Sequence, residues 1–288
     1  MTDQARSFGK YEILGPLGRG GFATVYRARD ATLDREVALK LLHPHHTLEP
    51  DFAQRFLQEA RTVASLSHPH IITLYEVGDL DGQLFLAMEL VDGGTLQGKL
   101  QGQGPLDLEA CVALLGGIAD ALDYAHSRGL VHRDVKPANI LLKTSHRGHL
   151  HPILSDFGLV KALAQSSELT RSGALVGTLE YMAPEQIDAD LGAQIGPATD
   201  IYALGIVAYH MLSGQVPFSG STANVMHGHL HKTPPALTDL RADVPPAAAA
   251  AIQRALAKAP GDRFPSATSF IQALAAAPAL PKRVPPPV

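Results

Sequence analysis

Hydrophobic and polar residues change their spacing about a third of the way along the chain. Before residue 89, short apolar or alternating runs bounded by glycine and charge predict strands around Val25 and at 11–14, 36–42, 71–75 and 84–88. One amphipathic helix interrupts them at about 51–66. Helical spacing then dominates, at 106–127, 200–212, 246–258 and 266–277. Segment 89–95 is therefore interpreted as a hinge between a strand-rich part and a helical part.

The composition is that of an ordinary globular chain. The 288 residues carry a formal net charge of −4, which argues against binding nucleic acid without sequence preference. Cys111 is the single cysteine, so there is no disulfide framework, and its apolar helical surroundings predict a buried structural thiol. The first residues are polar, and no apolar window approaches the roughly 18 residues of a membrane span. We expect a soluble cytoplasmic protein without a membrane segment in this chain.

Histidines form two local groups, one of His43, His45 and His46 and the other of His146, His149 and His151. Such tracts can bind metal, but neither group offers an i, i+4 pair on a helix with an acidic partner. We expect solvated loop histidines.

The most polar short stretch is 132–139, which reads HRDVKPAN and precedes an apolar strand candidate. Asp134 can accept a proton, Lys136 can neutralise phosphate charge, and Asn139 can bind a hard cation through its amide oxygen. The alternative is a solvated turn that happens to carry charge.

Glycines at 18, 20 and 21 separate two strand candidates near the N-terminus. Their backbone N–H groups can approach phosphate oxygens closely, although hairpin turns use the same residues. A strand rather than a helix follows, and no Gly-Lys-Ser/Thr closes the stretch, so it is neither a Rossmann fingerprint nor a P-loop.

Lys40 lies in the middle of an apolar strand, where its ammonium needs an anion. Glu59 projects near the apolar face of helix 51–66, so we expect a Lys40–Glu59 ion pair. The alternative is two unrelated surface charges that extend outward.

A second acidic motif, Asp156-Phe157-Gly158, ends the apolar run 153–155. The small polar residues of 159–176 predict a mobile loop, which 177–185 closes. From residue 277, alanine and proline predict a stiff, solvated tail or linker.

In this order the motifs resemble the signature set of protein kinases. The chain resembles a eukaryotic-like serine/threonine protein kinase of the bacterial receptor type over about residues 8–276. The resemblance implies an α+β bilobal fold, with a small antiparallel sheet lobe carrying one helix (8–91) and a larger, mostly helical lobe (92–276). The kinase domain would span 1–276, and the tail or linker 277–288.

The resemblance also implies roles for the polar residues. Asp134 would be the catalytic base, Lys136 would stabilise the γ-phosphate, and Lys40, held by Glu59, would reach the α- and β-phosphates. Asn139 and Asp156 would bind Mg²⁺, with Mn²⁺ as an alternative. The residues implied around ATP are Leu17, Gly18, Arg19, Gly20, Gly21, Phe22, Ala23, Val25, Ala38, Lys40, Met88, Glu89, Val91 and Leu141.

Regulation and structural support follow from the same resemblance. Arg133 implies an activation switch in which it binds a phosphate on loop 159–176, with Thr170 and Ser172 as candidate phosphosites. The alternative is that these hydroxyls only keep the loop soluble. Further implied roles are a peptide-binding platform at Thr178, a buried Glu185–Arg263 pair, Asp200 bracing the catalytic loop, and His132 packing on Phe157.

Two features depart from the family pattern. Ala23 replaces the third glycine of the glycine-rich loop while Gly21 adds one, so we expect altered loop flexibility. The segment between Asn139 and Asp156 is longer than expected, with a His-rich insertion at 144–152 that we interpret as a surface hairpin.

The expected function is ATP-dependent phosphorylation of Ser and Thr hydroxyls in proteins, with autophosphorylation of the activation loop. The alternatives are a pseudokinase-like ATP-binding scaffold and a small-molecule phosphotransferase of related fold. The resemblance allows a homodimer, and the domain could be the cytosolic part of a longer membrane-anchored protein. No nucleic-acid partner is expected.

Overall fold

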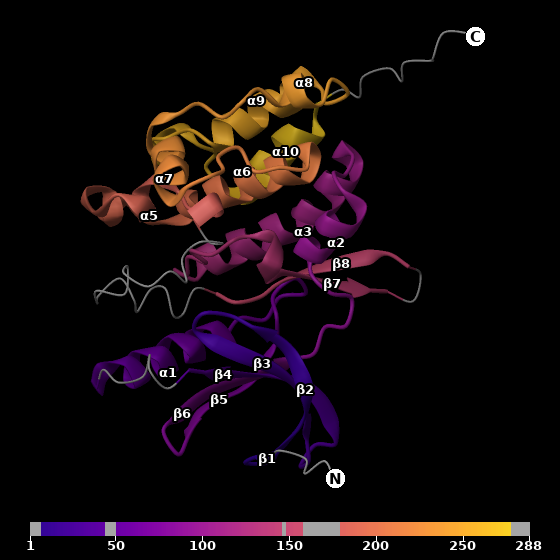
Figure 1. The fold of residues 1–288 in the computed structure, drawn as a ribbon, viewed down its shortest axis with the longest axis vertical. Coiled ribbons are helices and arrows are strands. Elements are labelled where there is room, and N and C mark those ends of the chain that lie inside the picture. Colours follow the sequence, from indigo (N-terminus) through magenta and orange to yellow (C-terminus); the bar gives the residue numbers. More distant parts are fainter. Residues whose placement is uncertain (1–6, 44–49, 146–147, 158–178, 278–288) are drawn as a thin grey trace.

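One antiparallel sheet contains all six N-terminal strands in the order β1-β2-β3-β4-β6-β5. In this computed structural model, residues 7–43, 50–145, 148–157 and 179–277 are described. The strands are β1 (Ser7–Phe8), β2 (Tyr11–Arg19), β3 (Ala23–Asp30), β4 (Arg35–Leu42), β5 (Leu74–Leu80) and β6 (Gln83–Glu89). Helix α1 (Pro50–Ala64) lies beside this curled sheet (Figure 1).

Helix α1 covers the sheet with the apolar side that its sequence pattern predicts. Phe52, Phe56 and Ala60 are buried in one cluster with side chains of β4 and β6. Two phenylalanines four residues apart lie on one face of a helix, and their rings stack at a centroid distance of 6.4 Å. This burial packs α1 against the sheet that contains the Lys40 strand.

The prediction of a strand at 71–75 is wrong in its position. Ile72 donates its N–H to the Leu154 carbonyl at 2.9 Å and so joins the C-terminal part, while β5 begins at Leu74 and continues to Leu80. The position of β5 follows from the turn that joins it to β6. Asp81 and Gly82 both have positive φ, 53° and 80°. Two-residue hairpin turns require such angles because they match the right-handed twist of the strands. The turn between the two strands therefore contains only Asp81 and Gly82, and β5 extends to Leu80.

Helices dominate the rest of the chain (Figure 1). The regular elements are α2 (Leu96–Gln103), α3 (Leu108–Ser127), β7 (Ile140–Thr144), β8 (Leu150–Leu154), α5 (Pro184–Ile187), α6 (Pro197–Ser213), α7 (Thr222–His231), α8 (Leu237–Leu240), α9 (Pro246–Ala255) and α10 (Ala267–Ala275). Short 3₁₀ turns lie at Pro137–Asn139, Leu179–Tyr181, Ala189–Gln194 and Pro260–Asp262. No helix within the described residues is long and apolar enough to cross a bilayer.

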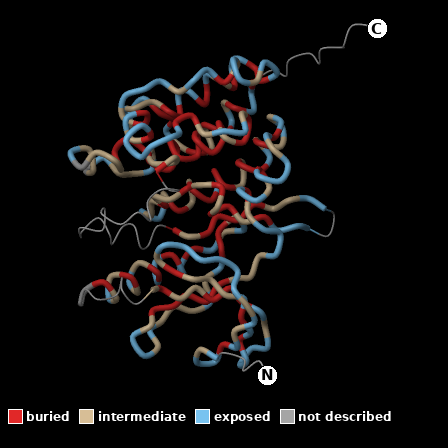
Figure 2. The backbone as a smooth tube through the Cα atoms, viewed as in Figure 1, coloured by how far each residue is buried: buried red, intermediate tan, exposed pale blue. Residues whose placement is uncertain are grey.

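Helix α6 forms the centre of this second part. Its side chains are buried around nearly the whole circumference, Ile201, Leu204 and Val207 among them, and Figure 2 shows buried backbone concentrated there. A helix that is apolar on all sides needs neighbours on all sides, and α3, α9 and α10 contact it. Cys111 of α3 lies in the same core, where burial raises the pKa of its thiol to about 12, as expected of a structural thiol.

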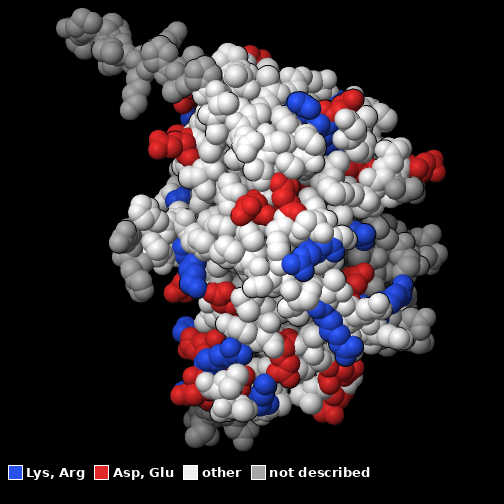
Figure 3. Space-filling view, turned by 180° about the vertical axis from the view of Figure 1, so that it is seen from behind, with Lys and Arg blue, Asp and Glu red and all other residues white. Residues whose placement is uncertain are grey.

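Charged side chains are unevenly distributed on the surface. On the face in Figure 3, acidic and basic groups are mixed over the sheet part, and the helical part is largely uncharged. Neither sign forms a continuous field on the described part of this face.

Two of the histidines expected to be solvated have structural contacts. His151 lies in β8, donates from Nε2 to the Pro69 carbonyl at 2.9 Å, and stacks on His70 at 4.2 Å. His43 bonds to the glycine-rich loop. His149 is exposed as expected, and the other three histidines of these groups lie outside the described residues. The error arose because sequence spacing says nothing about contacts made across strands.

An ion pair between Glu185 and Arg263 joins α5 to the turn before α10. Arg263 donates from Nη1 and Nη2 to the two carboxylate oxygens at 2.7 and 2.8 Å, and both side chains are almost completely buried. Thr199 donates to the same carboxylate at 2.8 Å. The pair therefore ties three segments of the helical part together.

We predict that Arg263→Leu lowers the free energy of unfolding by about 3–5 kcal/mol, because it leaves the Glu185 carboxylate buried without its counter-charge. Denaturant titration measures the change. The matched control is Arg27→Leu, which breaks an exposed pair with Glu36 and should cost at most about 1 kcal/mol. Equal losses in the two variants would contradict the prediction.

Candidate active site

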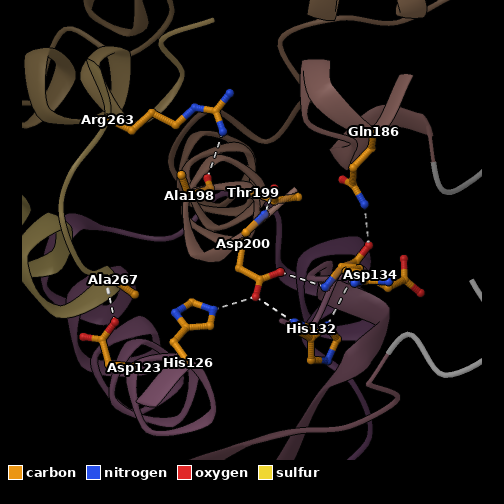
Figure 4. Close-up of polar contacts among 12 residues, drawn as sticks. Asp123, His126, His132, Asp134, Gln186, Ala198, Thr199, Asp200, Arg263 and Ala267 are labelled. Carbon is orange, nitrogen blue, oxygen red and sulfur yellow. Dashed lines mark hydrogen bonds and ion pairs between the residues drawn. The ribbon is translucent and has the colours of Figure 1, made fainter. Parts of the chain in front are cut away.

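Asp200, at the start of α6, holds the backbone of the 132–139 stretch. Its Oδ2 accepts from the His132 N–H and its Oδ1 from the Arg133 N–H, both at 2.8 Å. The carboxylate is completely buried, so these bonds are not exchanged for water. Figure 4 shows Asp200 between the helical core and the loop. This is the bracing position expected of Asp200.

His126 of α3 gives Asp200 a third partner that the sequence analysis missed. Its Nε2 lies 2.7 Å from Asp200 Oδ2. Three residues earlier, Asp123 accepts from the N–H groups of Ala267 and Thr268 at 2.8 and 2.9 Å and so caps α10 (Figure 4). Residues i and i+3 of a helix share a face. The spacing of Asp123 and His126 on a mostly buried helix could therefore have indicated polar contacts inside the helical part.

Arg133 adopts an unusual backbone conformation in the middle of the loop. Its φ is +64°, which costs energy for a residue with a side chain and persists only where surrounding contacts hold it. Asp200 binds its N–H, and Gln186 Nε2 donates to its carbonyl at 2.9 Å (Figure 4). Gln186 was not among the expected residues, because a glutamine on a short helix has no distinctive pattern.

His132 is structural rather than reactive. Its Nδ1 accepts from the Asp134 N–H at 3.2 Å, which leaves Nε2 to donate to the Ser155 carbonyl at 3.0 Å. Its ring packs on Phe157 at 4.6 Å, the contact expected from the sequence. Burial lowers the pKa of this imidazole, which favours the neutral form that both bonds require.

The side chains of Asp134, Lys136 and Asn139 meet within the loop. Lys136 Nζ lies 3.0 Å from Asp134 Oδ2, and Asn139 Nδ2 donates to the same oxygen at 3.0 Å. Asn139 Nδ2 also donates to the Asp134 carbonyl at 2.8 Å. The 3₁₀ turn Pro137–Asn139 brings the amide back over the carboxylate. The carboxylate is thus held in one orientation.

Lys40 and Asp156 come from different parts of the chain and form an ion pair. Lys40 Nζ lies 2.7 Å from Asp156 Oδ1. Asp156 has a φ of +56°, a second strained residue in this region. In the sheet, the backbone of Lys40 lies between Leu86 of β6 and Val25 of β3. The strand order therefore determines the position of its Cα atom.

The predicted Lys40–Glu59 ion pair is not formed in the described conformation. Within the described residues Lys40 pairs with Asp156, and no ion pair joins it to Glu59. Burial raises the pKa of Glu59, and the positive charges of Arg133 and Arg55 partly oppose this rise. Helix α1 therefore holds Glu59 where the charges of these two guanidinium groups act on its carboxylate.

The donor set suits a hard cation. Because both described bonds of the Asn139 amide use Nδ2, its Oδ1 is the atom available as a ligand. Asp156 adds carboxylate oxygens. Mg²⁺ prefers oxygen ligands and takes only one or two carboxylates together with substrate phosphates, so these residues fit it.

The apolar residues expected around ATP belong to one cluster. Ala38 and Met88 are buried in it, and Val25, Val91 and Leu141 pack against it. The Glu89 N–H donates to the Thr73 carbonyl at 2.9 Å, so an ATP contact at the backbone of Glu89 can only be made by its carbonyl. The Glu89 side chain forms an unexpected ion pair with Lys143 of β7 at 2.6 Å, which ties the hinge to the β7–β8 hairpin.

Residues expected around the phosphates line the turn between β2 and β3. Leu17, Gly18 and Arg19 end β2, and Ala23 begins β3. The Gly20 N–H donates to the Ala23 carbonyl at 2.9 Å and closes the turn. Thr170, Ser172 and Thr178 lie outside the described residues.

Comparison with known proteins defines the class first. Residues 11–274 match the family model described as "Protein kinase domain", so the chain belongs to the protein kinase family. The chain is 40% identical over 273 residues to the serine/threonine-protein kinase PknJ of Mycobacterium tuberculosis. The aligned region covers 94% of this chain and 46% of PknJ. The chain is 37% identical over 263 residues to the serine/threonine-protein kinase PrkC of Bacillus subtilis, 91% of this chain and 39% of PrkC.

Solved structures agree with this class. The kinase domain of M. tuberculosis PknI matches with a TM-score of 0.75 and 32% identity, covering 95% of this chain and 98% of that one. The chain is therefore a eukaryotic-like serine/threonine kinase domain of the bacterial type, with the expected α+β bilobal fold. It spans less than half the length of the curated relatives named above.

We predict that Asp200→Asn speeds hydrogen exchange at the His132 and Arg133 amides by about 10-fold or more, because bonds to a charged acceptor are worth roughly 1.5–3 kcal/mol. Native-state exchange followed by mass spectrometry measures this. Asp120→Asn on α3, whose carboxylate is exposed, is the control and should leave these amides protected. Unchanged exchange in Asp200→Asn would show that the loop does not depend on this carboxylate.

Proposed function

We propose that this chain transfers the γ-phosphate of ATP to serine and threonine hydroxyls of proteins. The observation that carries the proposal is the side-chain group Asp134, Lys136 and Asn139, joined by 3.0 Å contacts within one rigid loop. Phosphoryl transfer passes through a loose, charge-spread transition state, so a protein contributes mainly positioning and charge neutralisation. A held carboxylate beside an ammonium provides both.

In the proposed mechanism, Asp134 orients the substrate hydroxyl and accepts its proton. Asn139 keeps the carboxylate in place through Nδ2, and Lys136 offsets the charge that develops on the transferred phosphate. Mg²⁺, with Mn²⁺ as an alternative, would neutralise phosphate oxygens when held by Asp156 and the Asn139 amide oxygen.

Lys40 and Asp156 must exchange partners in this mechanism. Each has a proposed role in binding the nucleotide, but in the described conformation they neutralise each other at 2.7 Å. Lys40 would turn to the α- and β-phosphates, with Glu59 as its supporting carboxylate once α1 moves toward it. The described pairing is thus proposed to be a resting arrangement.

Regulation is proposed to act through the segment after Asp156. Arg133 lies in the strained part of the catalytic loop, and a phosphate on Thr170 or Ser172 would bind its guanidinium through charge-assisted bonds. Thr178 is proposed to belong to the peptide-binding platform that receives the protein substrate. The compartment we propose is the cytoplasm, where ATP is available and a free thiol such as Cys111 stays reduced.

We predict that the protein incorporates label from γ-labelled ATP with Mg²⁺, and that Asp134→Asn lowers the rate by about 100-fold or more because the base is lost. Autoradiography and phosphosite mapping by mass spectrometry measure the transfer. Asp243→Asn, at an exposed acid in the helical part, is the control and should transfer at the wild-type rate. Wild-type protein that binds ATP without transferring phosphate would favour a pseudokinase instead.

We predict that Thr170→Ala combined with Ser172→Ala lowers phosphorylation of an exogenous protein, because the loop phosphate that would bind Arg133 is absent. The initial rate on a general substrate such as myelin basic protein measures this after preincubation with ATP. Ser166→Ala with Ser167→Ala is the matched control. Equal rates for both double variants and the wild type would refute the loop-phosphate switch.

A further inference from the structure

His43 reaches from the end of one strand to the tip of the glycine-rich loop. It follows β4 directly, and its backbone N–H donates to the Phe22 carbonyl at 2.8 Å. Its ring nitrogens lie 3.1 Å from the Gly21 carbonyl (Nδ1) and 3.1 Å from the Thr24 hydroxyl (Nε2). One residue thus contacts both sides of the loop.

The chemistry of the partners defines the role of one ring nitrogen. The Gly21 carbonyl can only accept, so Nδ1 carries a proton and donates. Nε2 bonds with the Thr24 hydroxyl, which can donate or accept. Both ring nitrogens are used, and their partners are residues of the loop and of the strand that leaves it.

Strand register brings His43 to this place. Ala23 pairs with Leu42 and Thr24 with Leu41, so the next antiparallel pair along the ladder is Phe22 with His43. Lys40 lies three residues earlier on β4, and its side-chain position depends on the same ladder. The contact therefore joins the loop to the strand that carries the proposed phosphate-binding lysine.

The hydrogen bonds from His43 to the Gly21 and Phe22 carbonyls also set the direction of the backbone N–H groups that follow them. In a trans peptide the C=O and the following N–H point in opposite directions. The Phe22 N–H is therefore directed away from the imidazole, and the Ala23 N–H away from the His43 backbone N–H. Both amides belong to the stretch proposed to cover the phosphates.

A loop of this composition needs such a restraint. Gly20 and Gly21 have no side chains to pack, and glycine loses more backbone entropy on ordering than any other residue. Gly21 is also the extra glycine of this chain, and its carbonyl is the one that the imidazole binds. His43 thus restrains the loop where its composition makes it most mobile.

We propose that His43 is a positioning residue for nucleotide binding, which holds the tip of the glycine-rich loop in the conformation that receives the phosphates of ATP. The inference rests on the proposed function, because it assigns His43 to the same site. The sequence did not predict this role, because His43 lies close to His45 and His46 and the three were interpreted as solvated loop histidines.

The test compares ATP with adenosine, which shares the base and ribose but has no phosphates. His43→Ala removes both ring bonds and keeps the backbone bond, so the dissociation constant of ATP with Mg²⁺ should rise about 5- to 10-fold for two modest hydrogen bonds. Adenosine affinity should stay at the wild-type value. Isothermal titration calorimetry measures both ligands.

Further variants separate positioning from general structural damage. His43→Asn keeps a donor near the place of Nδ1 and should recover part of the ATP affinity. Thr24→Val removes one partner at nearly constant shape, and combined with His43→Ala it should add little, since both changes break the same contact. His231→Ala, at an exposed histidine of α7, is the control and should bind both ligands as the wild type does.

Opposite outcomes overturn the proposal. If His43→Ala binds ATP as the wild type does, or loses ATP and adenosine affinity equally, His43 does not position the loop for phosphates. These outcomes leave the proposed function intact when wild-type protein still transfers phosphate. Wild-type protein that binds no ATP would instead contradict the proposed function and this inference with it.

Discussion

The buried carboxylate of Asp200 is the constraint on which the candidate active site depends. It accepts two backbone N–H groups from the 132–139 loop and contacts His126 of α3. A charge removed from water is tolerated only where several donors satisfy it. Here two of those donors come from the 132–139 loop and the third from α3, so the stability of the helical core and the geometry of the loop are linked through one side chain.

A second buried carboxylate extends this support. Glu185 binds Arg263 and Thr199, and Gln186, the next residue, donates to the Arg133 carbonyl. The strained backbone of Arg133 is therefore held from α6 through its N–H and from α5 through its carbonyl. Helix α5 therefore binds the helical core through Glu185 and the 132–139 loop through Gln186.

The charged groups between the sheet part and the helical part are held less permanently. Lys40 and Asp156 pair at 2.7 Å, with Lys40 mostly buried and Asp156 about a third exposed, while the charges of Arg133 and Arg55 act on Glu59. Because these charges sit on separate elements, small movements of α1 change which pairs form. His43 restrains the neighbouring glycine-rich loop through strand register. The firmly held support of the 132–139 loop thus lies within the helical lobe, and the exchangeable charge pairs join the two lobes.

Much of the fold and the site could be predicted from short-range patterns in the sequence. Asp134, Lys136 and Asn139 lie within six residues, so one local turn decides their contact, and the periodicity of α1, α3 and α6 follows from local burial. The partners of Lys40 and His43 and the contact of His126 with Asp200 could not be predicted, nor could the start of β5. Lys40 and Asp156 are separated by 116 positions. Their pairing depends on how lobes, strands and helices pack, and only the tertiary structure decided it.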